Sequence, residues 1–265
     1  MLLGIDHLVI GVPDPDAAAA QLERELGLAA SGGGRHEAWG TFNRLVWLGD
    51  TYLELIGVFD GALAARSWIG APTLAVLAGG GGLATWAIAS DALEPDLEAL
   101  RVAGSELGEP MAGQRRRDDG ALVRWRVAAP RLLGLCEPPF LIEHDPTAAE
   151  WTPAERDARL ALVHPLGGPV RLEVLELFVD DVNQTLQRFL RTIGLRFRPS
   201  IAGGGARDAT IGAQLVRLRP RRPGSVSAVM RLAARVPAGR TVELLGCRWV
   251  VRPAVQSESR SSAGR

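Results

Sequence analysis

The chain has 265 residues, of which 47% are hydrophobic and 23% charged, and its 30 basic side chains equal its 30 acidic ones in number. This composition is typical of a folded globular protein, and a net charge of zero excludes a strong field that would attract nucleic acid or an anionic membrane. No stretch approaches the ~20 apolar residues of a membrane span, and the N-terminus lacks the basic and apolar regions of a signal peptide. We therefore expect a cytoplasmic protein with neither nucleic acid nor membrane among its partners.

Two cysteines, Cys136 and Cys247, are present. They lie far apart and lack the CxxC spacing of a metal site, so we expect reduced thiols in a reducing compartment.

The first predicted elements are a strand and an amphipathic helix between residues 5 and 28. Apolar side chains alternate along residues 5–12 on both faces, which predicts a strand covered on both sides. Asp14 and Pro15 are typical of a helix N-cap and first helical position, and Gly27 is typical of a left-handed helix stop.

The same pattern returns twice. A shift of 77 residues (Gly104 minus Gly27) and a shift of 167 residues (Gly194 minus Gly27) each align a further strand and helix with the first. Asp-Gly at 119–120 marks a hairpin in the middle unit. Each unit ends in a strand, at residues 52–57, 140–144 and 241–246. The sequence therefore predicts an α+β protein built from three βαβββ units.

Several stretches resemble the vicinal oxygen chelate superfamily, and more closely its glyoxalase-like branch. The resemblance extends over roughly residues 4 to 170. It rests on the residues at 5–10, 33–36, 40–43, 52–56, 82–87, 119–126, 139–143 and 164–165.

The resemblance implies two βαβββ modules that curl their sheets into a cleft. We expect residues 1–168 to form this glyoxalase-like domain, with modules at about 4–60 and 82–146. A third module would occupy residues 169–253, and residues 254–265 would form a disordered tail. Because an unpaired module leaves a sheet edge uncovered, we also expect a homodimer through residues 170–252.

Superfamily members that hold a metal take ligands from the first and fourth strands of each paired module. Carried over to this chain, the resemblance implies the ligands His7, Glu54 and Glu143, with Ala84 at a fourth position that cannot ligate. One histidine and two carboxylates suit Zn, Mn, Fe(II), Ni or Mg. Such an ion would polarise an enolate oxygen while Glu54 or Glu143 acts in acid–base catalysis, as an isomerase or lyase requires.

Strand alternation supports the inward placement of these residues. His7 would share a face with Ile5 and Val9, while Glu54 and Glu143 each interrupt an apolar strand, where an unpaired carboxylate is costly to bury. Around this centre we expect the small oxygen-rich ligand to contact five side chains, namely His36, Thr41, Asn43, Trp86 and Trp125.

Other interpretations fit the same residues. His7 is equally typical of a hydrogen-bonded core histidine, and an arginine partner would satisfy Glu54 without metal. Glu243 repeats Glu54 although its partner position holds Val174, which favours a structural role for such a glutamate. His36 also suits a solvated loop, and the tryptophans suit core packing.

Two function classes therefore stay open, a metal-assisted enzyme and a metal-free protein that binds or sequesters a small molecule. A nucleotide cofactor is not expected, because the glycine runs at 32–34, 79–82 and 203–205 lack the strand–GxGxxG–helix context.

Overall fold

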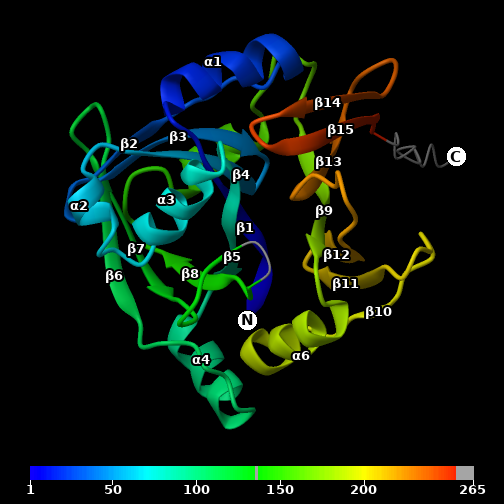
Figure 1. Cartoon of the computed structure of the whole chain (residues 1–265). Helices are drawn as coiled ribbons and strands as arrows, with labels where there is room; N and C mark the ends of the chain where they lie inside the picture. The colour runs from blue at the N-terminus through cyan, green and yellow to red at the C-terminus, as the bar shows by residue number, and fades with distance from the viewer. Residues whose placement is uncertain (135–136, 255–265) are drawn as a thin grey trace, which may run out of the picture.

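The computed structural model describes residues 1–134 and 137–254, so Cys136 and residues 255–265 of the predicted tail lie outside the described residues. A closed barrel, with strand order β1-β4-β3-β2-β6-β7-β8-β5, lies beside an open sheet with order β10-β11-β12-β9-β13-β15-β14 (Figure 1). Within the described ranges no helix is long and apolar enough to cross a membrane.

The barrel is formed by two βαβββ modules, as predicted. In each, the first strand runs parallel to the last, and the two first strands pair antiparallel at the centre. The first module is β1 (Leu2–Gly11), α1 (Pro15–Leu26), β2 (Gly33–His36), β3 (Thr41–Leu48) and β4 (Thr51–Val58). The second is β5 (Gly82–Ser90), α4 (Leu93–Val102), β6 (Met111–Arg116), β7 (Leu122–Ala128) and β8 (Phe140–His144). Short helices join them or follow them: η1 (Glu37–Trp39), α2 (Gly61–Ala64), α3 (Gly70–Ala78) and α5 (Pro153–Leu160).

Helix α1 begins and ends where the sequence predicts. The Asp14 carboxylate accepts the backbone N–H groups of Asp16 and Ala17, and Gly27 ends the helix at φ 67°. Both devices satisfy backbone groups that the helix leaves without partners.

The open sheet contains a third βαβββ module, whose last strand is not the predicted one. β12 pairs parallel to β9 as β4 pairs to β1, whereas β14 pairs antiparallel to β15. The prediction of residues 241–246 as the closing strand is therefore wrong. Apolar residues alternate with polar ones in any strand that packs one face on a core, so this pattern did not identify which strand pairs with β9. The elements are β9 (Arg171–Val179), α6 (Val182–Ile193), β10 (Arg198–Pro199), β11 (Arg207–Ile211), β12 (Gln214–Pro220), β13 (Ala228–Ala234), β14 (Arg240–Leu244) and β15 (Cys247–Pro253).

Strand pairing also corrects the supposed repeat of Glu54. Glu54 lies opposite Val9, and the corresponding pair in the open sheet is Arg217 opposite Glu176. Glu243 lies on β14, where it is paired with Arg248 of β15. The open sheet therefore carries an arginine where the barrel carries Glu54.

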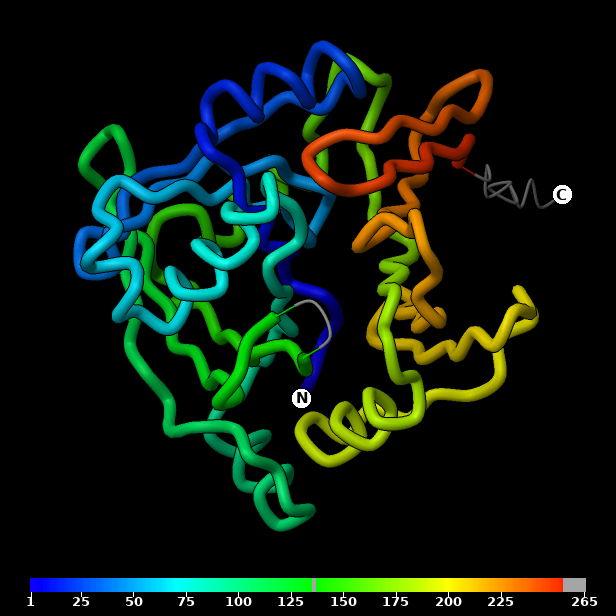
Figure 2. Tube along the Cα trace, viewed as in Figure 1, coloured from blue at the N-terminus to red at the C-terminus, as the bar shows by residue number. Residues whose placement is uncertain are grey.

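One hydrophobic core joins the open sheet to the outer face of the barrel. Leu8 of β1 and Trp86 of β5 belong to the same buried cluster as Leu175, Phe189 and Trp249 of the C-terminal part. Figure 2 shows the C-terminal trace running beside the barrel. The barrel interior is consequently separate from the interface between the two sheets. The predicted role of this part in assembly stays a prediction.

Candidate functional site

A β-bulge in β1 places two polar side chains together at the barrel interior. Ile5 lies opposite Ile88 and His7 lies opposite Ala87, so Asp6 is an extra residue on β1. Strict alternation predicted that Ile5 and His7 share a face. The bulge instead turns Ile5 to the outer core and leaves the neighbouring Asp6 and His7 side chains both buried.

A matching bulge in β5 changes the alignment of the two modules. Val9 lies opposite Thr85 and Ile10 opposite Leu83, so Ala84 is the extra residue there. A shift of 78 residues (Leu83 minus Ile5) aligns the bulge in β5 with the bulge in β1. This shift is one residue more than the predicted shift of 77. Thr85, rather than Ala84, therefore occupies the place that His7 holds in the first module.

The fourth strands show a larger mismatch, of three residues. Phe140 lies opposite Ala87 as Glu54 lies opposite Val9, so Phe140 is the counterpart of Glu54. Glu143 lies three residues further along β8 and is paired with Arg126. Its neighbours Ile142 and His144 line the small cavity, so the side chain of Glu143 lies on the other face of the strand.

Four of the buried polar residues form a linked cluster. Nδ1 of His7 lies 2.6 Å from Oδ1 of Asp6, and Nε2 of His7 lies 3.6 Å from Oε2 of Glu54. Asn43 donates through Nδ2 to Oε1 of Glu54 at 2.6 Å. Asp6 and Asn43 thus hold His7 and Glu54 face to face, within reach of a shared proton.

Two further histidines extend this cluster. Nε2 of His144 lies 3.1 Å from both oxygens of Asp6. Nε2 of His36 lies 3.9 Å from Oε1 of Glu54, while its Nδ1 lies 3.0 Å from Oγ1 of Thr41. Thr41 therefore orients His36 from behind rather than lining the cavity itself.

The charge states of this cluster follow from burial and neighbours. Burial lowers the pKa of His36 to about 4, with Arg115 and His7 adding to the effect, so His36 is neutral at pH 7. Burial also lowers the pKa of His144. For Asp6 burial acts in the opposite direction, but the adjacent His144 and His7 hold its pKa well below the usual value. Asp6 is thus a fixed negative charge behind His7.

Aromatic side chains form the walls. Tyr52 stacks on His7 with ring centroids 4.6 Å apart, and the edge of Phe140 faces the same imidazole. Trp151 stacks on His144 at 3.4 Å. The walls enclose a cavity of about 40 Å³, which the tryptophans Trp39, Trp68 and Trp125 also line.

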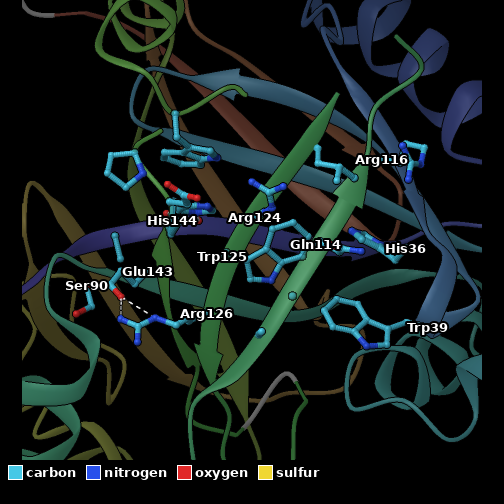
Figure 3. A pocket seen from close by; sticks show the side chains of 18 of the residues that line it. His36, Trp39, Ser90, Gln114, Arg116, Arg124, Trp125, Arg126, Glu143 and His144 are labelled. Atoms are coloured by element: carbon cyan, nitrogen blue, oxygen red, sulfur yellow. Dashed lines mark hydrogen bonds and ion pairs between the residues drawn. The ribbon is translucent and has the colours of Figure 1, made fainter. Parts of the chain in front are cut away.

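A larger hollow of about 1160 Å³ adjoins this small cavity (Figure 3). Both spaces are lined by His36, Trp39, Trp125, His144 and Trp151. A ligand therefore has room for a bulky part in the hollow and for only a small group beside Glu54.

Three polar atoms that belong to cavity-lining residues have no hydrogen-bond partner among the residues that the structure describes. They are Oδ1 of Asn43, Nε1 of Trp68 and Nδ1 of His144. An unpaired buried polar atom costs about 1–3 kcal/mol, so these positions favour a bound molecule that supplies the missing partners.

A buried ion pair closes the same end of the barrel. Nη2 of Arg115 on β6 lies 2.5 Å from Oε2 of Glu150, and the Arg115 guanidinium also donates to the carbonyl of Gly33 on β2. This pair joins the edges of the two modules to the segment that follows β8. Trp151, the next residue along, is thereby fixed against His144.

The predicted site residues separate into two groups. His7, His36, Asn43, Glu54 and Trp125 line one cavity. Glu143 lines the larger hollow instead, where Figure 3 shows it paired with Arg126, and Trp86 is fully buried in the interface, 6.2 Å from the Phe189 ring.

The sequence reasoning also missed Asp6, His144, Trp151 and the Arg115–Glu150 pair. The Asp6-His7 dipeptide was a usable signal for one of them, since a buried histidine needs an orienting partner. His144 was recognisable only as the residue two after Ile142 on the same strand face.

The donor set does not fit the predicted three-ligand metal centre. Nε2 of His7 and the Glu54 carboxylate are close enough to share one ion, but Thr85 and Phe140 occupy the two matching positions of the second module. Throughout the described ranges, no three histidine, cysteine or acidic side chains come together as metal ligands.

Comparison with known proteins gives the family. The family model for the glyoxalase-like domain matches residues 5–193. This chain belongs to the glyoxalase-like domain family. Its fold and its strand pairing are those of the vicinal oxygen chelate superfamily that the sequence motifs resemble.

Similarity to a solved structure extends over nearly the whole chain. A hypothetical protein from Staphylococcus aureus is similar over 95% of this chain and 100% of its own, with 14% identity and a TM-score of 0.77. Methylmalonyl-CoA epimerase from Streptomyces coelicolor, in complex with 2-nitronate-propionyl-CoA, is 20% identical with a TM-score of 0.42, covering 56% of this chain and 99% of that one. The epimerase from Mycobacterium tuberculosis is 21% identical with a TM-score of 0.42, covering 55% and 90%. No curated protein matches.

Proposed function

We propose that the barrel binds a small oxygen-rich molecule and moves a proton on it, with Glu54 as the base and His7 as its partner. The observation that supports this most is the polar cluster at the bottom of an aromatic cavity. A carboxylate, an imidazole and unpartnered hydrogen-bonding atoms converge there on a space that holds only a small group.

The chemistry suits proton abstraction next to a carbonyl. Glu54 would take the proton, and His7, which lies 3.6 Å away and is oriented by Asp6, would accept it from Glu54 or return it. Trp68 offers an N–H donor to the oxygen on which negative charge develops, and donors of this kind stabilise such oxyanions strongly in a dry site. Asn43 keeps Glu54 in place through the whole cycle.

This proposal routes no step through a metal, because in the described part of the chain no three histidine, cysteine or acidic side chains are arranged as metal ligands. His36, Asn43 and Trp125 would contact the ligand, as predicted from the sequence. Glu143 is better suited to hold Arg126 and α4 in place than to take part in catalysis.

A thermal-shift screen of small carbonyl compounds tests the proposal. We expect 2-oxo acids, hydroxyketones or acyl thioesters to raise the melting temperature of the wild type. Glu54→Gln should bind the same compounds without turning them over, because the amide keeps the size of the side chain but cannot take a proton. Glu243→Gln, which alters an exposed ion pair with Arg248 on the other sheet, is the control.

The second function class is binding without turnover. The aromatic walls favour it, since Trp39, Trp68, Trp125 and Trp151 would enclose a flat molecule without any chemistry. It would be preferred if compounds that stabilise the protein are recovered unchanged, with no proton exchanged, from wild type and Glu54→Gln alike.

A further inference from the structure

The outer face of the open sheet carries an arginine cluster at the place that corresponds to the barrel site. Glu176 on β9 lies between β12 and β13, opposite Arg217 on one side and Val229 on the other. These residues share the face that points away from the core, because Leu175 and Leu177 on either side of Glu176 belong to the buried cluster. Strands β10 and β14 form the two edges of this sheet (Figure 1).

Three guanidinium groups surround one buried carboxylate. Nε of Arg219 donates to Oε2 of Glu176 at 2.8 Å, and Nε of Arg231 donates to Oε1. Arg217 lies 3.5 Å from Oε1 and forms two bonds with Asp208, at 2.7 and 2.8 Å. Three positive charges thus face two negative ones, and Glu176 itself is only 1% exposed.

The contacts leave a defined set of donors unused. Arg219 and Arg231 each bond to Glu176 through Nε alone. In the described part of the chain the terminal amino groups of these two arginines have no hydrogen-bond partner. Because the two Nε atoms bind different oxygens of one carboxylate, the two guanidinium forks (the paired terminal amino groups of each arginine) are fixed on either side of it. Burial alone would raise the pKa of Glu176, but the bonds from Arg231 and Arg219 outweigh this effect and lower the pKa below its usual value. The carboxylate therefore stays charged and holds both guanidinium groups.

A glycine loop adds further donors beside one of these forks. Gly203, Gly204 and Gly205 all have positive φ, at 65°, 64° and 75°, and a Cβ on Gly204 would lie 3.9 Å from Nη1 of Arg219. The amides of Gly204 and Gly205 bond to no other group of the described residues. Free amides next to an arginine fork are the usual components of an anion site.

We propose that Arg219 and Arg231, together with the loop at Gly204, bind a small oxyanion of the phosphate or carboxylate class. The excess positive charge carries this inference, since three guanidinium groups face the two carboxylates of Glu176 and Asp208. The site is distinct from the barrel cavity and does not depend on its proposed function.

Titration with inorganic phosphate at constant ionic strength tests this site. Calorimetry and the melting temperature of the full chain should both show saturable binding to the wild type. The double variant Arg219→Gln/Arg231→Gln should bind at least about tenfold more weakly, because it removes both guanidinium groups that would form charge-assisted bonds to the anion. Arg248→Gln, which removes the exposed pair with Glu243 on the same sheet, should bind as the wild type does.

Three outcomes would overturn the proposal. They are equal phosphate binding by the double variant and the Arg248→Gln control, no saturation of the wild type below about 10 mM phosphate, and self-association that the double variant abolishes in the absence of phosphate binding. The last outcome would assign the arginines to a contact with a second copy. If the double variant fails to fold, Arg219→Lys serves instead, since it keeps the charge but loses the fork and should still weaken binding.

Discussion

Replacing Arg115 with methionine is expected to destabilise the protein by about 3 kcal/mol. The side chains of Arg115 and Glu150 are 4% and 10% exposed, so the substitution leaves a buried carboxylate without its main partner. Breaking such a pair from one side costs about 3–5 kcal/mol. Nε of Arg117 lies 3.9 Å from the same carboxylate and compensates in part, which favours the lower end of this range.

Urea unfolding followed by circular dichroism measures the effect. Arg156→Met is the matched control, since its pair with Asp50 is exposed on both sides and should contribute less than about 1 kcal/mol. Adding Glu150→Gln to Arg115→Met should recover part of the loss, because it removes the buried charge. Equal costs for Arg115→Met and Arg156→Met would refute the view that a buried ion pair closes the barrel.

Three further predictions concern pH, packing and a turn. Because the pKa of His36 is lowered to about 4 on folding, the unfolded chain binds a proton that the folded one does not, so stability present above pH 6.5 is lost as the pH falls toward 4. The loss is on the order of 3 kcal/mol, and His36→Gln should flatten it in unfolding curves measured between these pH values. Trp86→Ala should cost about 3–5 kcal/mol in urea unfolding because Trp86 fills the interface between barrel and α6; a cost below about 1 kcal/mol would contradict this packing. Gly212→Ala should lower the melting temperature without changing ligand binding in the barrel, since Gly212 has φ 54° and a Cβ there would meet the Leu3 carbonyl at 2.0 Å; an unchanged melting temperature would count against this contact between the sheets.

The sequence was sufficient for the modules because helix boundaries are determined locally. Asp14 and Gly27 mark one helix, and Asp181 and Gly194 mark its repeat, without any information about distant strands. Strand partners depend on contacts between distant residues. The closing strand of the third module was therefore misassigned, although its helix was correct.

The site was predictable only in part for a related reason. His7, Glu54 and Asn43 belong to one module, so local alternation was enough to bring them together. The bulges at Asp6 and Ala84 are visible only in the pairing of β1 with β5, and each shifts the side-chain alternation by one residue. That shift explains why Ala84 rather than Thr85 was matched to His7, and why Asp6 escaped notice. It does not explain the match of Glu143 to Glu54, which is three residues away from the true counterpart Phe140.

Proton exchange at the bound ligand tests the central claim most directly. The compound that stabilises the protein best would be incubated in D₂O with the wild type, Glu54→Gln or Glu243→Gln, and its proton next to the carbonyl followed by NMR. We expect the wild type and Glu243→Gln to replace this proton with deuterium, and Glu54→Gln to bind the compound without exchange. Equal exchange in all three proteins, or none in the wild type, would contradict the assignment of Glu54 as the base.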